Sequence, residues 1–548
     1  MNKFKLNIFT VGLAATGLLM GSCSESFLDV ESKTESTTGN FYKTEGDAWR
    51  ALVGCYDGWR QVSSSLGGSS FYLISTVMSD ECYGSTGNGD GRGFQTIDQF
   101  DQSQSPSDLQ ILSDNWKQYY RGVYRCNELI THEDNFEWKE GSNNHGLYMG
   151  EARALRALLY FDMVRTWGNI PLFLEPSQEN REQASPDSVY TAIFDDLKYA
   201  VENIPADANL DSKSFGRVTK YAAEAVLARA YLFYTGYYGK EPQNVTKAEA
   251  LAAVEDVIAS NNYKLVDDFK DLWPAASLVP IPNAVGWDTE KSTYAGDANS
   301  EIILSMLFTP TQDYNGNNDS NRWQVMMGMR SLNWTPYGKG WGACCVTPAY
   351  MEKYLKNDPR FKASVIDLIG EGVNKSTDYE NSVNDWREYT GYTVKKYSPL
   401  VFGDGKPGTK PDGSAGFQEC NPQPWNIVRY ADVLLMAAEL GSSNAQRYLD
   451  MVRSRAGLGS IPVTQQNIMD ERARELAFEG HRYWDLLRQG VNVMADAVAA
   501  CAGEVLSGGN PSTVSYDKSK IIATQGLSQI PLDQITLSNG VLKQNPGW

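Results

Sequence analysis

Residues 471–488 carry a high density of acidic and basic side chains, which at close spacing could transfer protons. The charges fall into three pairs with a spacing of three residues: Arg472 with Glu475, Glu479 with Arg482, and Asp485 with Arg488. Residues three apart are neighbours on a helix surface, so each pair is expected to form an exposed ion pair. An adjacent cation keeps a carboxyl group ionised and inert. We therefore predict a structural role for this segment and no catalytic residue in it.

Aromatic residues are concentrated in the middle of the chain, where flat rings could bind sugars. Of the 14 Trp residues, five lie between Leu272 and Gly342. A sugar has hydroxyl groups and apolar C–H faces, so it needs rings for stacking and amide or Arg groups for hydrogen bonds. The candidate ligand-binding residues here are Trp287, Trp323, Trp334, Trp341, Tyr294 and Arg322. The alternative is that these rings only attach long loops to the core.

A second polar loop, at residues 80–93, is rich in glycine and offers further contacts for a ligand. Its candidate ligand-binding residues are Tyr83, Asn88 and Arg92. Asn88 and Asp90 also bring oxygen atoms close together, as do residues 313–319, but neither segment has the spacing of a complete EF-hand. We therefore predict no metal site and no cofactor.

Composition excludes several other functions. The chain has 548 residues and a net charge of −18, without a long run of Lys or Arg. A protein that binds the phosphate backbone needs clustered positive charge, so nucleic acid is not an expected partner. Only three His residues are present, which disfavours a zinc site or a histidine base. The motifs of serine hydrolases and dinucleotide-binding folds are absent from the sequence.

The N-terminus has the pattern of a secreted protein. Lys3 and Lys5 precede a short apolar run, which is followed by small residues and Cys23. This order is typical of a signal peptide. The segment 20–23 resembles the lipobox of bacterial lipoproteins, in which the cysteine becomes the acylated first residue. We expect cleavage after residue 22 and a lipid anchor at Cys23 that holds the protein on a membrane.

Helical spacing of apolar residues dominates both ends of the chain. Predicted helices cover residues 44–59, 113–129, 150–167, 185–203, 218–238 and 246–260, and then 429–440, 443–457 and 464–489. Ser185 before Pro186 is a start signal, and Gly168 is a stop signal. Small and aromatic residues at 221–231 resemble the packing of tetratricopeptide repeats, although the repeat period is irregular. In the loop-rich middle, 301–306 is a predicted strand and 348–355 a predicted short helix.

These patterns divide the chain into five predicted segments. They are a signal peptide (1–22), a flexible lipidated leader (23–40), an N-terminal helical region with tetratricopeptide-like pairs (41–263), a loop-rich and aromatic region (264–416) and a C-terminal helical region (417–548). The fold class is mostly α.

Several segments in order resemble the SusD/RagB family of outer-membrane lipoproteins from Bacteroidetes. The similar segments are 23–29, 151–161, 167–172, 429–439, 452–458, 471–488, 529–532 and 544–548. Little of the loop-rich middle shows this resemblance. The resemblance implies one mostly helical body of tetratricopeptide-like pairs with a large insertion. It also implies a surface protein that binds glycans or other nutrients and works with a TonB-dependent transporter of the SusC type, without catalysis.

Three functions are compatible with these sequence features. The first is a lipid-anchored glycan-binding protein that delivers an oligosaccharide to a SusC-like transporter. The second is a lipid-anchored glycoside hydrolase that uses paired carboxyl groups, although such pairs are common in a chain with 67 Asp and Glu residues. The third is a helical scaffold or binder of another nutrient.

Overall fold

The computed structural model describes residues 41–63, 71–101, 111–277, 291–309, 320–401, 416–418 and 421–548. The predicted signal peptide, the leader, Cys23 and Trp287 lie outside these residues. The described part is mostly helical, with short strands.

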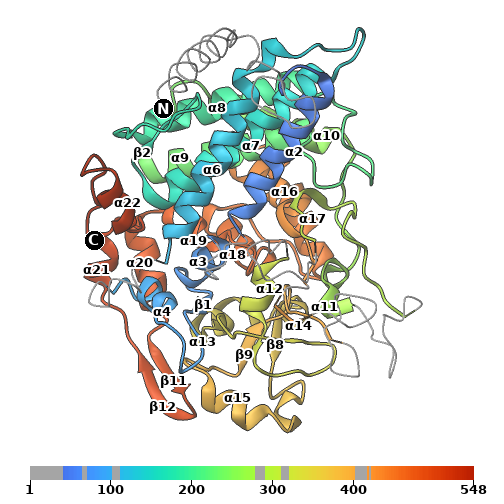
Figure 1. Cartoon of the computed structure of the whole chain (residues 1–548). Coiled ribbons are helices and arrows are strands. Elements are labelled where there is room, and N and C mark those ends of the chain that lie inside the picture. The colour runs from blue at the N-terminus through green and yellow to red at the C-terminus, as the bar shows by residue number, and fades with distance from the viewer. Residues whose placement is uncertain are drawn as a thin grey trace, which may run out of the picture.

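The N-terminal half is built from long helices that lie side by side in the upper part of the molecule (Figure 1). They are α2 (Glu45–Gln61), α6 (Ser113–Thr131), α7 (Asn144–Trp167), α8 (Pro186–Asn203), α9 (Lys220–Tyr238) and α10 (Lys247–Ala259). Three further helices or turns precede or join them: α3 (Phe71–Val77), α4 (Gly93–Asp98) and η2 (Glu133–Asn135). Capping side chains stabilise the N-termini of several of these helices. Thr44 and Thr246 each form a reciprocal capping box, and Ser185 accepts a hydrogen bond from the N–H of Ser188.

Consecutive long helices pack against each other as predicted for tetratricopeptide-like pairs. Helix α2 packs on α6, α7 on α8, and α9 on α10. A Cβ atom added at Gly58 would lie 2.9 Å from the Cα of Gly122, so these two glycines allow α2 and α6 to approach closely. Helix α7 is buried along most of its length, because other helices surround it. None of the described helices has the length and apolar character needed to cross a membrane.

The middle of the chain forms small sheets in the lower part of the molecule (Figure 1). Strands β1 (Cys82–Tyr83), β7 (Cys345–Val346), β9 (Tyr392–Val394) and β8 (Val365–Asp367) form one sheet in that order. Strand β4 (Ile302–Met306) confirms the predicted strand, and it pairs antiparallel with β10 (Trp425–Arg429). This pairing joins the loop-rich region to the C-terminal region, and one apolar core extends through both.

The remaining elements of this region are short. They are η3 (Phe269–Leu272), α11 (Pro274–Ser277), α12 (Arg322–Met327), β5 (Met329–Arg330), β6 (Lys339–Gly340), α13 (Pro348–Tyr350), η4 (Met351–Leu355), α14 (Phe361–Ser364), η5 (Val373–Lys375) and α15 (Tyr379–Asp385). Together, α13 and η4 match the predicted short helix.

The C-terminal helices lie between the N-terminal helices and the sheets (Figure 1). They are α16 (Tyr430–Glu439), α17 (Ala445–Arg455), α18 (Gln465–Glu475), α19 (Arg482–Leu487) and α20 (Val491–Ala499). The hairpin of β11 (Gly503–Ser507) and β12 (Asn510–Val514) follows, and then α21 (Lys518–Ala523) and α22 (Leu532–Leu537). The smaller hairpin of β2 (Ile170–Pro171) and β3 (Gln183–Ala184) follows α7.

The single helix predicted over 464–489 is wrong, because the structure has two helices there. Phe478 and Gly480 adopt positive φ values of 64° and 78° between α18 and α19. Both values are incompatible with a continuous right-handed helix. The turn allows the N–H of Phe478 to donate a hydrogen bond to Glu81 Oε1 at 2.7 Å. The turn thus connects the C-terminal helices to the segment before β1.

Apart from half-buried Arg474, the charged side chains of 471–488 are buried, which corrects the prediction of exposed pairs three residues apart. Their partners come from distant elements. Glu479 accepts hydrogen bonds from Arg429 and Lys396, whereas Arg482 donates two bonds to Asp80 and one to the hydroxyl of Tyr354. Only the pair of Asp485 and Arg488 has the predicted spacing. The structural role remains, but the network ties the core together and does not cover a surface.

The buried network has compensating charges. Burial raises the pKa of the Glu475 carboxyl group, but Arg455, Arg429 and Arg360 lower it more strongly, so the net pKa is well below the usual value. Glu301 and Glu471 bind the same arginines. Burial of charges without such partners would cost several kcal/mol each.

Candidate functional site

Two predicted ligand-binding rings lie in the core, and the prediction is corrected for them. Trp323 and Tyr83 both have 0% exposed surface. The ring of Trp323 packs on Trp425 at a centroid distance of 3.6 Å, while the hydroxyl of Tyr83 donates to the carbonyl oxygen of Cys501 at 2.6 Å. Neither ring has a free face for a sugar. Both residues therefore follow the alternative prediction, in which the ring attaches a loop to the core.

Trp341 is half-buried and has a charged side chain against its ring. The guanidinium carbon of Arg322 lies 4.8 Å from the centroid of the indole. Arg322 is a predicted ligand-binding residue, but it is only 2% exposed. It therefore supports the ring of Trp341 and is not exposed to a ligand. A cation against one face of an indole stabilises its position. The structure therefore brings together two predicted residues, of which Trp341 has exposed surface.

Trp334 is half-buried at the tip of the loop that connects β5 with β6. Its backbone N–H and carbonyl group pair with those of Tyr337, at 2.9 and 2.7 Å. The ring packs against a second apolar cluster that includes Tyr337 and Leu400. The loop is therefore anchored at its tip, and the indole has a defined position at the surface.

The polar loop at residues 84–93 is held by two arginines from the loop-rich region. Arg387 donates hydrogen bonds to the carbonyl oxygens of Asn88 and Asp90, the latter at 3.0 Å. Arg330 donates to Asp90 Oδ2 at 2.9 Å. Asn88 and Arg92 are exposed on this loop, and Asn88 Nδ2 donates to the carbonyl oxygen of Asn384. Asp90, considered above as an oxygen ligand, instead pairs with Arg330.

Arg330 joins three segments that are distant in the sequence. Its Nε donates to Asp385 Oδ2 at 2.7 Å, and its Nη1 contacts both Asp90 and the carbonyl oxygen of Trp341. We define the loop face as residues 84–93, 330–341 and 384–388. Arg330, Asp385 and Arg387 belong to it, and sequence reasoning missed all three. No local motif marks them, because each partner lies in another segment.

A buried pair of carboxyl groups lies beneath the loop face. Asp98 accepts hydrogen bonds from the N–H of Gly84 at 3.0 Å and from the hydroxyl of Tyr516 at 2.8 Å. Burial raises the pKa of Glu388 to about 7, and the pKa of Asp98 rises because of burial and the charge of Glu388. This pair makes the base of the loop face sensitive to pH near neutrality.

Tyr294 has a different environment from the loop face. Its hydroxyl donates to Asp297, and the neighbouring Ala295 N–H donates to the carbonyl oxygen of Asp271 at 2.9 Å. The segment that carries Tyr294 therefore lies against η3. Trp287 and Cys23 lie outside the described residues, so their roles remain predictions.

The loop face has the chemistry of a binding surface. It combines two half-buried indoles with exposed amide and guanidinium groups, which suit the apolar faces and hydroxyl groups of a sugar. Its acidic residues Asp90 and Asp385 share Arg330 as a partner. Among the described residues, no group of three His, Cys, Asp or Glu residues is arranged to hold a metal ion.

Comparisons with known proteins match this architecture. The model of the SusD family matches residues 300–548, and a model described as "Starch-binding associating with outer membrane" matches residues 78–232. SusD-like protein P38 from Formosa agariphila is 26% identical over 523 residues, which are 89% of this chain and 92% of that protein.

Solved structures of other proteins have a similar fold over most of this chain. A laminarin-binding SusD-like protein is 27% identical, with a TM-score of 0.71, and the match covers 92% of this chain and 100% of that chain. Surface glycan-binding protein A from Bacteroides fluxus is 25% identical, with a TM-score of 0.72 and the same coverage. The two family models lie in sequence order on the helical and loop-rich regions described above. The chain belongs to the SusD family.

Proposed function

We propose that the protein is a lipid-anchored glycan-binding protein of the outer-membrane surface, and that its loop face binds the glycan. The observation that carries the proposal is the half-buried indole of Trp341, whose carbonyl oxygen shares Arg330 with Asp90 of the polar loop. A second half-buried indole, Trp334, lies on the connection between β5 and β6 that precedes Trp341. Sugar rings would stack on the indoles, and Asn88 and Arg92 would bind hydroxyl groups. Trp287 and Tyr294 remain additional candidates.

Rigid support favours binding by such a surface. Arg330 and Arg387 fix the polar loop, while Arg322 supports the ring of Trp341. A surface that is ordered before binding loses less conformational entropy when the ligand arrives. This arrangement suits capture of a glycan without chemical change.

The choice of a test ligand follows from the similar structures. One of them binds laminarin, so laminari-oligosaccharides are the first ligands to test here. Membership in the SusD family also supports an outer-membrane location, a lipid on Cys23 and delivery of the bound oligosaccharide to a SusC-like TonB-dependent transporter. Co-purification of the transporter with the tagged protein from outer membranes would test that partner.

Calorimetric titration tests the ligand site. Trp341→Ala and Trp334→Ala should each weaken binding of laminari-oligosaccharides, because truncation of a central aromatic contact often costs over about 2 kcal/mol. That energy corresponds to an affinity loss of roughly thirtyfold. Trp138→Ala is the matched control, since Trp138 is also a half-buried indole but lies outside the loop face.

The outcomes distinguish the three functions. Unchanged affinity in both loop-face variants would place the ligand elsewhere. Release of new reducing ends from the glycan would favour the hydrolase. Absence of binding to laminarin, starch and other glycans would favour a scaffold or a binder of another nutrient.

A further inference from the structure

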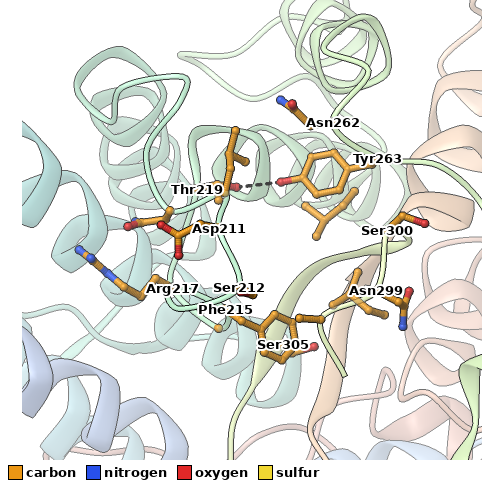
Figure 2. A pocket seen from close by; sticks show the side chains of 16 residues that line it. Asp211, Ser212, Phe215, Arg217, Thr219, Asn262, Tyr263, Asn299, Ser300 and Ser305 are labelled. Carbon is orange, nitrogen blue, oxygen red and sulfur yellow. Dashed lines mark hydrogen bonds between the residues drawn. The ribbon is translucent and has the colours of Figure 1, made fainter. Parts of the chain in front are cut away.

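A cavity lies among the helices, away from the loop face. It is formed by the connection between α8 and α9, by the residues after α10 and by the segment that enters β4 (Figure 2). Its volume is about 350 Å³, at the lower end of the range of about 300–1,000 Å³ that is typical of small-molecule sites. It shares no lining residue with the loop face.

Two aromatic rings line this cavity on different sides. Figure 2 shows Tyr263 near Thr219 on one side and Phe215 near Ser305 on another. The Tyr263 hydroxyl lies 3.5 Å from Thr219 Oγ1, and its ring packs edge-on against Tyr221, so the side chain has a fixed position. Rings on separate walls can contact the apolar faces of a compact ligand.

The charged residues of the cavity already have partners. Arg217 donates both Nε and Nη2 to the carboxylate of Glu151, with the Nε contact at 3.1 Å. Asp211 Oδ1 accepts the N–H groups of Lys213 and Ser214 at 2.8 and 2.9 Å. A charged ligand would have to compete with these contacts, so the cavity favours a neutral ligand.

Uncharged polar groups supply the available hydrogen bonds. Within the described residues, the side chains of Asn262 and Ser212 form no hydrogen bond, and both are exposed. Asn262 offers an amide donor and acceptor, and Ser212 offers a hydroxyl group. Trp49 lies beside Arg217, on the side of the cavity that Arg217 lines. Its ring is 39% exposed, and the guanidinium carbon of Arg217 lies 4.9 Å from the ring centroid.

From this combination we infer that the cavity is a second saccharide site. It binds one or two sugar rings at the end of a neutral glycan. Tyr263 and Phe215 contact the apolar ring faces, and Asn262 and Ser212 bind hydroxyl groups. Beside Arg217, Trp49 provides a stacking surface for the part of a longer glycan that extends out of the cavity. Two sites on one chain would hold a long glycan more tightly than either site alone, provided that the glycan spans them.

The test uses the full-length protein in detergent and saturation-transfer NMR with the neutral disaccharides laminaribiose and maltose. Ser212→Trp fills the cavity, whereas Lys213→Trp places the same indole on the neighbouring exposed residue outside the lining. Both changes are made in the parent and in a Trp334→Ala/Trp341→Ala background, in which the loop face no longer contributes to binding.

In the background variant, disaccharide signal should remain, and Ser212→Trp should weaken binding at least about tenfold while Lys213→Trp leaves it unchanged. Equal signals from these two variants, or no signal in the background, would overturn the inference. Failure of the proposed function is a separate result, because it appears as parent-like binding in the Trp334 and Trp341 variants. If the background variant does not fold, parent crystals soaked in maltose give the answer: density between Tyr263 and Phe215 supports the site, and its absence overturns it.

Discussion

Arg429 binds Glu479 through two hydrogen bonds inside the protein, with Nε donating to Oε2 at 2.7 Å and Nη2 to Oε1 at 2.9 Å. The pair joins strand β10 to the turn between α18 and α19. Lys396 donates to the same carboxylate at 2.7 Å, so one buried acid connects three segments. Burial raises the pKa of Glu479, but Arg429 and Lys396 lower it more strongly, and the group is ionised.

Glu479→Gln is predicted to destabilise the protein severely. The amide keeps the shape of the side chain but leaves the charges of Arg429 and Lys396 without their common partner. Loss of one member of a buried pair typically costs about 3–5 kcal/mol. Chemical denaturation followed by circular dichroism measures this loss.

Leu476→Ala serves as the comparison within the same turn. Leu476 is 2% exposed, and truncation of a buried Leu costs about 2–5 kcal/mol. We expect the two variants to lose similar stability, in contrast to the small cost of about 0–1 kcal/mol for an exposed ion pair. A melting temperature like that of the parent for Glu479→Gln would contradict the buried network.

The sequence predicted the elements whose signals are local. Apolar spacing placed α2, α8 and α10 within a few residues, and the start signal at Ser185 marked the beginning of α8, because a cap and a helical face are both set by near neighbours. Burial of the charges at 471–488 could not be predicted in this way. The partners of Glu479 and Arg482 lie far away in sequence, and a spacing of three residues suggested a local pair instead.

The same limit applies to the candidate site. Aromatic composition drew attention to the loop-rich region but could not separate the core ring of Trp323 from the half-buried ring of Trp341. Exposure depends on tertiary packing, in this case on Trp425 and on Arg322. Arg330 had no sequence signal, because its importance comes from two carboxylates in separate segments.

Arg330→Gln is predicted to weaken glycan binding through loss of order in the loop face. Gln cannot bind Asp90 and Asp385 at once, so the loop at residues 84–93 should lose its attachment to Arg330 and keep that to Arg387. Both carboxylates are partly exposed, and the expected loss of stability is therefore only about 1 kcal/mol. Titration with laminari-oligosaccharides should show a clear decrease in affinity, with hydrogen exchange faster at 84–93.

The control for this variant is Arg121→Gln on the exposed surface of α6. Its affinity and exchange should equal those of the parent. Parent-like affinity in Arg330→Gln, together with faster exchange in the loop, would show that order in this loop does not determine binding.

Cys23→Ala is predicted to prevent attachment of lipid. The thiol of Cys23 is the expected acylation site, and several acyl chains at about 0.8 kcal/mol per buried methylene would give a durable anchor. Labelling with a fatty-acid analogue should mark the parent and not the variant. Cys501→Ala is the control, since Cys501 is buried in the fold. Persistent label on Cys23→Ala would exclude the lipobox interpretation.

Stability is predicted to fall as the pH rises towards neutrality, because of Glu388. Burial raises its pKa from 4.5 to about 7, so between these values the folded protein keeps a proton that the unfolded chain has lost. Where the folded state binds more protons, an increase in pH favours unfolding. The contribution of Glu388 to the stability of the folded protein is therefore full below pH 4.5, and it is lost as the pH rises through about 7.

Glu388→Gln removes this titration and should flatten the pH dependence. Urea unfolding at pH about 5 and about 8 should show a smaller difference in the variant than in the parent, by up to about 3 kcal/mol at about 1.4 kcal/mol per pKa unit. Other titrating groups are common to both proteins, so the comparison isolates this carboxyl group and its effect on Asp98. Glu380→Gln, the same change at an exposed position of α15, should keep the slope of the parent. An unchanged slope in Glu388→Gln would show that Glu388 is already ionised in the folded protein, and that the carboxyl pair beneath the loop face does not respond to pH in this range.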